Sequence, residues 1–469
     1  MAPHSSPPPH SFRSRHLRFT GRYYGAGVTA TVVQSAPTNP QPPSTGARPS
    51  RPTPARVQLI TAGLIAAALA LLAVTAASFI QARSQADTVN SRARTAAQAG
   101  DLYFALADLD SEAARLVLLG DGDFQTVSGA YDGNQLSALI AYNDRTAQVD
   151  TDLQALAADG ASSTAIAAGV TQYRSIADAS IGLDEFPGAP AGQPLGTSIG
   201  FYSRATTMMQ DVVLPAASQL RNQTAAEASQ AADSAHTWAI VGLIGTLVLG
   251  VLAVLVLVRA QRRFTVMFRR TVNPALFAAT LVAAALLIGA AIGLASTAQD
   301  ASDSGSRLAA YLQVVVTRAD SYDVDGTAVR SVLMPDAFNS AQVDPKEQIV
   351  DGDLTKLGSA GGAAAAIWSK SSKGPVADYQ TILNAVASGD TAQALTVETG
   401  TARGDAAFDF YNYDQSLQTL GTERLADFQS AASGLSSDVS PWLYWPWILA
   451  GVTLLLIAVA VRPRLAEYR

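Results

Sequence analysis

VQLITAGLIAAALALLAVTAASFIQA, residues 57–82, contains no charged side chain and decides the fold class. Three further stretches run at least twenty residues without a charge, over 237–258, 271–299 and 439–461. An α-helix needs about 20 apolar residues to cross the roughly 30 Å hydrocarbon core of a bilayer. The chain is therefore predicted to be an all-α membrane protein with four transmembrane helices.

The composition agrees with this interpretation. Of the 469 residues, 48% are hydrophobic and only 15% are charged, a balance that is wrong for a soluble globular chain. A soluble enzyme is thereby excluded as a description of the whole chain. Cysteine is absent, so the sequence offers no disulfide framework, thiolate metal site or lipoprotein cysteine.

The arginines predict the orientation in the membrane, because cytoplasmic loops retain basic residues beside the spans. The first 56 residues hold seven arginines and no acidic residue. The short middle loop holds five arginines and no acid, and the last eight residues hold three arginines and one glutamate. Both termini are expected to be cytoplasmic, and the two large loops extracytoplasmic. The predicted location is the plasma membrane, which the chain would cross several times.

These observations predict nine segments. They are a disordered Pro/Arg-rich cytoplasmic tail over 1–56; transmembrane segments over 57–80, 237–258, 274–296 and 441–461; extracytoplasmic helical bundles over 81–236 and 297–440; a basic cytoplasmic loop over 259–273; and a cytoplasmic tail over 462–469. Because span, loop, span occurs twice in the same sense, we interpret the two halves as parallel repeats. Each bundle is expected to resemble a four-helix bundle.

The first large loop is expected to begin with an unbroken helix from Leu59 to Leu119, because neither Pro nor a clustered Gly interrupts it after the span. Apolar residues recur there at spacings of three and four, which is typical of one packed helix face. Charged residues occupy the other positions. Further helices are expected over 135–156, 164–183 and about 195–235, the last bent at Pro215. Over 101–120 the charged residues of this helix are Asp101, Asp108, Asp110, Glu112 and Arg115.

The second large loop repeats this plan more loosely. The helix of the third span is expected to continue toward Met334, followed by a polar stretch to about Leu357. Helices are then expected over 376–387, 391–399 and 405–435.

No catalytic, cofactor or metal site is expected from the sequence. Three of the four histidines lie in the N-terminal tail, and no phosphate loop, nucleophile elbow or zinc spacing occurs. The string Asp320, Asp323, Asp325, Gly326 is the most metal-like, but an EF-hand loop counted from that Gly would end at Val332 where a Glu is required. We interpret it as a helix-to-helix turn. Nucleic acid is not an expected partner.

Two groups of residues are candidate docking sites. The middle loop could contact a cytoplasmic partner through exposed aromatic residues flanked by arginine, or it could be a basic hairpin resting on membrane lipid. The aromatic residues at the start of the fourth span could form an interfacial belt or an outer docking platform. The first group is Arg262, Arg263, Phe264, Phe268, Arg269 and Arg270, and the second is Trp442, Tyr444, Trp445 and Trp447.

Three segments carry a resemblance to a known family: DLYFALADLDSEAARLVLLG at 101–120, PLGTSIGFYSRATTMMQDVVLPAASQL at 194–220, and FDFYNYDQSL at 408–417. They resemble the actinobacterial four-span membrane proteins of the GlnX type. The resemblance implies tandem sensor domains and a relay that reports the occupancy of an extracytoplasmic amino-acid-binding lipoprotein to a cytoplasmic Ser/Thr kinase of the protein kinase G type.

The leading hypothesis is accordingly a non-enzymatic signal relay for amino-acid status. Alternatives are an accessory subunit of a transport or cell-envelope system, and a chemosensor that binds a small molecule directly. Glycines in the second and third spans permit close helix approach within one chain or between two copies, so a homodimer stays open. They are Gly242, Gly245, Gly250, Gly289 and Gly293.

Overall fold

The computed structural model describes residues 53–120, 131–185, 189–268, 273–369, 373–400 and 403–466. Within these ranges all regular secondary structure is helical and no strand occurs, which confirms the all-α prediction. Residues 1–52 of the predicted disordered tail lie outside the described residues.

Four helical runs in the described ranges are long and apolar enough to cross a membrane: Gln58–Leu119, Gly196–Val266, Pro274–Leu333 and Ala406–Arg462. The most apolar part of each run exposes many large hydrophobic side chains, a surface that is favourable in lipid and unfavourable in water. This exposure confirms a multi-pass membrane protein. Examples from the four spans are Leu69, Ile80, Ile244, Val248, Leu281, Ile288, Leu455 and Val459.

The first half contains the helices that the sequence predicts. They are α1 (Thr53–Leu119), α2 (Tyr131–Ala158), α3 (Thr164–Glu185), α4 (Gly196–Met208), a π-helical turn η2 (Met209–Val213) and α5 (Leu214–Phe268). The π-turn lies just before Pro215, where the sequence predicts a bend. Proline lacks an N–H group and its ring crowds the preceding turn, so the helix widens just before it.

The second half begins with α6 (Pro274–Leu333), which starts with Asn273 as its N-cap. Its remaining elements are α7 (Ser340–Leu357), η3 (Gly358–Gly361), α8 (Gly362–Trp368), α9 (Pro375–Ser388), α10 (Thr391–Thr399), α11 (Ala406–Val439), η4 (Ser440–Leu443) and α12 (Trp445–Ala466).

Helix α7 lies where the sequence suggested only a polar stretch, and that prediction is wrong. Asn339 and Gln342 form a capping box that satisfies N–H groups at the start of the helix. One narrow face, with Val343, Val350 and Leu354, is buried against the rest of the protein. The polar residues on the other faces dominate the composition and hide this spacing.

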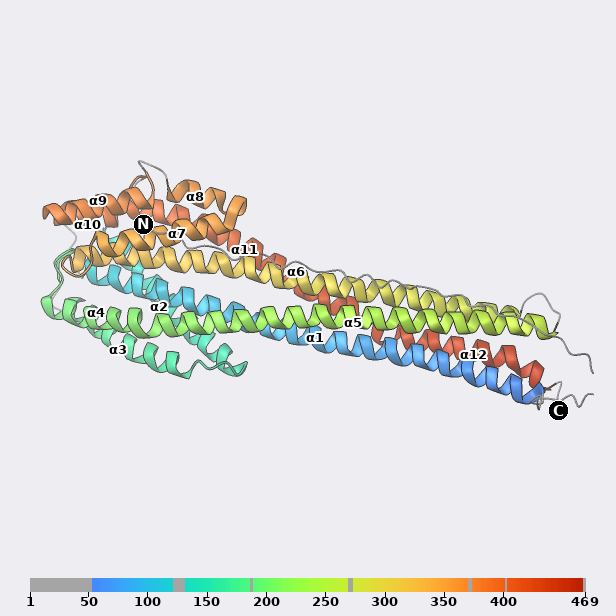
Figure 1. The fold of residues 1–469 in the computed structure, drawn as a ribbon. Helices are drawn as coiled ribbons and strands as arrows, with labels where there is room; N and C mark the ends of the chain where they lie inside the picture. Colours follow the sequence, from blue (N-terminus) through green and yellow to red (C-terminus); the bar gives the residue numbers. More distant parts are fainter. Residues whose placement is uncertain are drawn as a thin grey trace, which may run out of the picture. The chain divides into compact units, whose positions relative to one another are not determined.

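Helices α1, α5, α6 and α11–α12 run side by side (Figure 1), with α1 packed against both α5 and α6. We call residues 81–236 and 297–440 the head. Most of the buried hydrophobic residues of its two segments form one continuous cluster that both segments share. At residues 104–114 every side of α1 is buried, which makes this part of α1 the central helix of the head.

Where the head meets the spans, Trp442 stacks on Phe79 with ring centroids 5.0 Å apart and planes 9° apart. The indole lies against two glycines of α6, Gly289 and Gly293. A Cβ atom at these positions would come within 2.6 Å and 2.7 Å of the ring. Small residues here let Trp442, which leads into α12, lie directly on α6.

We therefore predict that Gly293→Ala lowers the unfolding temperature of the purified chain, because the indole is held between the new methyl group and Phe79 and cannot retreat. Overpacking of this kind costs about 1–3 kcal/mol. Differential scanning fluorimetry in detergent measures the effect. Gly451→Ala is the matched control, since no atom lies within 4 Å of its Cβ position. Equal unfolding temperatures for the two variants would contradict this packing argument.

Candidate functional site

The centre of the head contains the same order of residues on two helices. DLDSEAARLVL at 108–118 on α1 and DVDGTAVRSVL at 323–333 on α6 share two aspartates, an alanine, an arginine, a valine and a leucine at equal spacing. Each motif places a pair of acids and one base on a helix that continues into a span. The site is built from these two motifs.

The two motifs pair reciprocally. The arginine of each motif binds the second aspartate of the other, with Arg330 Nη1 2.8 Å from Asp110 Oδ2 and Arg115 Nη2 2.8 Å from Asp325 Oδ2. Asp110, Asp325 and Arg330 are each 1% exposed. Since removing one partner would leave a buried charge unpaired, the two contacts together fix how α1 lies against α6.

Asp110 is fully engaged with its neighbours. Its Oδ1 accepts a hydrogen bond from the Tyr173 hydroxyl at 3.1 Å. Its Oδ2 accepts from Thr206 Oγ1 at 3.0 Å and from Gln210 Nε2 at 3.2 Å, in addition to Arg330. One carboxylate therefore joins α1 to α3, α4, η2 and α6.

Asp325 has an equivalent but smaller set of partners. Its Oδ2 accepts from Ser111 Oγ at 2.9 Å and from Arg115, while its Oδ1 accepts from the Tyr379 hydroxyl at 3.3 Å. Tyr379 on α9 thus takes the role that Tyr173 on α3 has at Asp110. The pairing of the two halves extends to the helices that surround the motifs.

The first aspartate of each motif binds a base from the helix that follows. Asp108 pairs with Arg145 on α2, and Asp323 pairs with Lys346 on α7 at 2.6 Å. Burial raises the pKa of Asp108 to about 6 although Arg145 opposes the shift. Burial acts in the same direction on Asp323, but Lys346 and Arg330 outweigh it and hold the pKa of Asp323 below its ordinary value.

The halves differ three residues before each arginine. Arg330 Nη2 donates to the neutral Thr327 Oγ1 at 2.8 Å, whereas Arg115 Nη1 donates to the carboxylate of Glu112 at 2.9 Å. Burial, only partly offset by Arg115, raises the pKa of Glu112 to about 7. The Arg115 half therefore carries an acid that the Arg330 half lacks.

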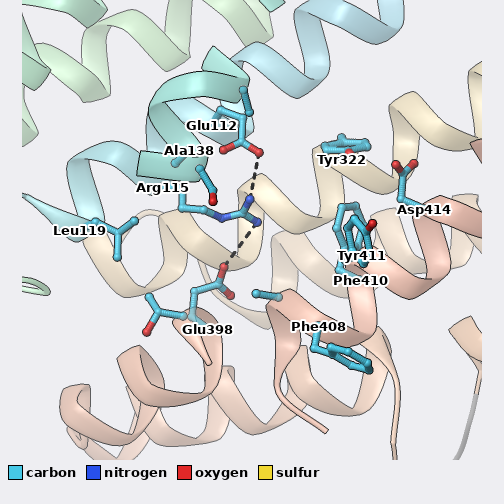
Figure 2. Close-up of a pocket in the computed structure, with 14 residues that line it drawn as sticks. Glu112, Arg115, Leu119, Ala138, Tyr322, Glu398, Phe408, Phe410, Tyr411 and Asp414 are labelled. Carbon is cyan, nitrogen blue, oxygen red and sulfur yellow. Dashed lines mark hydrogen bonds and ion pairs between the residues drawn. The ribbon is translucent and has the colours of Figure 1, made fainter. Parts of the chain in front are cut away.

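A cavity of about 360 Å³ adjoins the Arg115 half. Figure 2 shows Arg115 pointing toward it between Glu112 and Glu398, with aromatic rings on the side of α11. Concave sites with mostly apolar walls and a few convergent polar groups are the usual form of a small-molecule site. Its walls include Glu112, Arg115, Leu119, Ala138, Tyr322, Glu398, Phe408, Phe410, Tyr411 and Asp414.

Glu398 on α10 is the least satisfied group in this wall. It is 1% exposed, and neither carboxylate oxygen accepts a hydrogen bond. Arg115 Nη2 approaches to 4.0 Å, which is too far for a hydrogen bond. Burial and the nearby Asp325 raise the pKa of Glu398 well above its ordinary value, against the effect of Arg115.

The docking residues expected from the sequence do not converge on this cavity. Arg262 and Arg263 are exposed near the end of α5. The expectation that Phe264 is exposed is wrong: its ring is 8% exposed and packs in a cluster with Leu257 and Leu276. Helix α5 ends at Phe268, whose side chain, like Arg269 and Arg270, lies outside the described part of the structure.

The aromatic group at the start of the fourth span divides into two parts. Tyr444, Trp445 and Trp447 are 70%, 50% and 57% exposed and are free to meet an interface. Trp442 instead stacks on Phe79 inside the chain. An interfacial belt or docking platform is therefore limited to the other three.

The interpretation of Asp320, Asp323 and Asp325 as a helix-to-helix turn is wrong, because all three lie inside α6. Asp320 accepts from the Tyr103 hydroxyl at 3.2 Å, while the other two belong to the paired motifs. Amphipathic spacing does not predict this network, because it assigns charged residues to the solvated face of a helix. The repeated order of residues on α1 and α6 is the signal that could have revealed it.

Residues 85–233 match the family model of an actinobacterial sensor domain. No curated protein and no solved structure matches the chain. The matched range is the first head segment, which supplies Asp110, Glu112 and Arg115, so a sensing or signalling role is the function class that the comparison supports.

We predict that Arg330→Met strongly destabilises the protein, because it leaves the Asp110 carboxylate buried without its counter-charge, at a cost of about 3–5 kcal/mol. The double variant Asp110→Asn with Arg330→Met should recover much of that loss. Thermal unfolding of the wild type, the two single variants and the double variant in one detergent measures the coupling between Asp110 and Arg330. Arg307→Met, at an exposed arginine of the same helix, is the control. Additive effects of the two substitutions would contradict the pairing.

We also predict a pH dependence of stability. The pKa of Glu112 in the folded protein is about 7, above its ordinary value of 4.5, so the folded state binds the proton more tightly than the unfolded state. This contribution is complete below pH 4.5 and is lost as the pH rises through about 7. The unfolding temperature of Glu112→Gln should therefore fall less between pH 5 and pH 8 than that of the wild type. The exposed Glu423→Gln should retain the wild-type slope, and identical slopes for all three would refute the assignment to Glu112.

Proposed function

We propose that the chain is a non-enzymatic transmembrane relay that converts an extracytoplasmic input into a change at its cytoplasmic face. One observation carries the proposal: the two helices joined by the reciprocal ion pairs, α1 and α6, each continue without interruption into a span. At about 1.5 Å per residue, the 67 residues of α1 extend roughly 100 Å. A shift of α6 in the head against α1 and α5, which both pack against it, would therefore move the spans.

The proposed orientation rests on charge. Arg259, Arg262 and Arg263 end α5, and Arg462 ends the fourth span, all at the membrane side away from the head. Basic residues beside spans favour the cytoplasm. The head would then be extracytoplasmic and both termini cytoplasmic, in the plasma membrane.

The proposed partners follow from the resemblance to proteins of the GlnX type. An amino-acid-binding lipoprotein would dock on the head and deliver amino-acid status, and a Ser/Thr kinase would receive the signal. The exposed Arg262 and Arg263 are available to such a kinase or to anionic lipid. Because Phe264 is buried, the basic residues, and not this ring, would make the cytoplasmic contact.

Direct sensing of a small molecule is a second candidate, because the cavity beside Arg115 lies at the contact between the two halves. The two candidates are compatible, since a relay can have more than one input.

A reversible crosslink tests the relay. An ideal Cβ at Gly305 on α6 lies 3.1 Å from Ala232 Cβ on α5, so cysteines at both positions need to separate by only a few tenths of an ångström to reach the roughly 3.5–4.5 Å of a disulfide. The chain has no other cysteine to interfere. We expect the oxidised Ala232→Cys, Gly305→Cys variant to abolish the change in cellular Ser/Thr phosphorylation that follows addition of amino acids, and a reductant to restore it.

The two single-cysteine variants are the controls, and blocked maleimide labelling verifies that the disulfide has formed. A fully crosslinked chain that responds like the reduced chain would overturn a relay through relative movement of α5 and α6. Co-purification with an ATPase, together with loss of solute flux on deletion, would instead support a transport accessory subunit.

A further inference from the structure

We propose that the cavity beside Arg115 binds a small organic cation, an amine or a quaternary ammonium, whose charged nitrogen lies on the cavity side of Glu112 and Glu398. Its role as a signal rests on the proposed relay, but the binding itself does not. The proposal stands on a buried carboxylate without a hydrogen bond, which we call unpartnered, on an excess of acidic residues and on an aromatic wall.

The unpartnered carboxylate is Glu398. Buried polar groups in folded proteins almost always have hydrogen-bond partners, and a buried charge without one is costly. Both oxygens of Glu398 lack a hydrogen bond, and so does Oε2 of Glu112. Both acids line the cavity, so a ligand with N–H groups or a positive charge would satisfy these acceptors once the two side chains turn toward it.

The charges around the cavity do not balance. Each arginine that reaches this region is already committed to an aspartate or a glutamate. The surplus of acid over base is therefore two formal negative charges, and one bound monocation would remove half of it. The acids are Asp108, Glu112, Asp325, Glu398 and Asp414, and the bases are Arg115, Arg145 and Arg318.

The walls select an organic cation over a metal ion. Four aromatic side chains line the cavity, and aromatic faces attract organic cations. In the described part of the chain no three His, Cys, Asp or Glu residues are grouped as a metal ion requires. A volume of about 360 Å³ is also far larger than a bare ion needs. The rings are Tyr322, Phe408, Phe410 and Tyr411.

A free amino acid fits less well than an amine. Its carboxylate would need a cation, and the arginine in the wall, Arg115, already donates to Glu112 and Asp325. A second anion there would lie close to Glu398 as well, where like charges repel. The cavity chemistry therefore favours amines without a free carboxylate, and an amino-acid signal would enter through another surface.

Binding at this place would act on the contact between the halves. The cavity walls come from α1 and α2 in the first half and from α6, α10 and α11 in the second. A cation drawn to Glu112 and Glu398 would weaken the hold of these acids on Arg115. Arg115 would then be freer to strengthen its pair with Asp325, which changes the contact of α1 with α6.

The test uses the full chain in lipid nanodiscs and isothermal titration calorimetry. The probes are choline and phenethylamine, with phenethyl alcohol as the neutral analogue of nearly the same shape and glutamine as the zwitterion. We expect at least one of the two cations to bind, with at least tenfold higher affinity than the alcohol and the zwitterion. Absence of binding by both cations, or equal affinity for phenethylamine and its alcohol, would overturn the proposal.

Two variants locate the site. Glu398→Gln keeps the shape and removes the charge, so it should weaken cation binding at least tenfold. Glu347→Gln is the matched control, because Glu347 on α7 is also a buried glutamate with an unpartnered oxygen but does not line the cavity. If Glu398→Gln fails to fold, Glu112→Gln serves in its place. Equal affinity of the wild type and the folded cavity variant would refute the site.

The pH dependence provides an independent readout in the unmodified chain. Glu398 faces Glu112 and Arg115 on α1, Asp325 on α6 and Asp378 on α9, and the balance of burial and these charges keeps its pKa raised. A cation needs the ionised carboxylate, so binding should tighten from pH 5 to pH 8 and release protons to the buffer. If the measured binding enthalpy does not depend on the ionisation enthalpy of the buffer, no proton is released on binding. That result would contradict ionisation of a protonated acid by the bound cation.

The outcomes separate this site from the relay. If a cation binds but the Ala232→Cys, Gly305→Cys crosslink does not alter the phosphorylation response to amino acids, the binding site is supported and the relay is refuted. If the crosslink abolishes that response but neither cation binds, the relay is supported and the binding site is refuted.

Discussion

The reciprocal ion pairs between α1 and α6 are the constraint on which the head depends. Each arginine pairs with a buried aspartate of the other helix, so neither helix can slide or rotate without stranding a charge in the core. The remaining head helices attach to the same two carboxylates, through Tyr173 at Asp110 and Tyr379 at Asp325. The two head segments therefore share one core because their central helices share one polar network.

This constraint reaches the spans because packed helices behave as stiff elements and adjust between discrete arrangements. Near the start of the spans the polar network gives way to close apolar packing, where Trp442 lies between Phe79 and the glycines of α6. A stiff helix that is held by ion pairs in the head and by close packing near the spans transmits a displacement from one end to the other. The long unbroken run of α6 provides that connection.

Hydropathy and turn residues were sufficient to predict the four spans and most helix boundaries, since these depend on local composition. The site was not predictable in the same way. Amphipathic spacing assigns charged residues to a solvated face, yet Asp108, Asp110 and Glu112 are buried because α1 is surrounded by helices from both halves. That environment exists only after residues more than two hundred positions apart have met. Phe264 was also misplaced, since it packs in a cluster with residues of the other spans, among them Leu64 and Ile457.

The two ion pairs have different neighbours and are therefore suited to different roles. Asp110 has four side-chain partners and binds an arginine that is completed by the neutral Thr327, so any displacement there breaks several satisfied contacts. Arg115 instead stands among Glu112, Asp325 and Glu398, whose combined charge exceeds its own. A cation that shifts between competing acids loses little when its neighbours rearrange, because one contact replaces another. The Asp110 pair is thus suited to be the fixed pivot between the halves, and the Arg115 pair to be the part that responds.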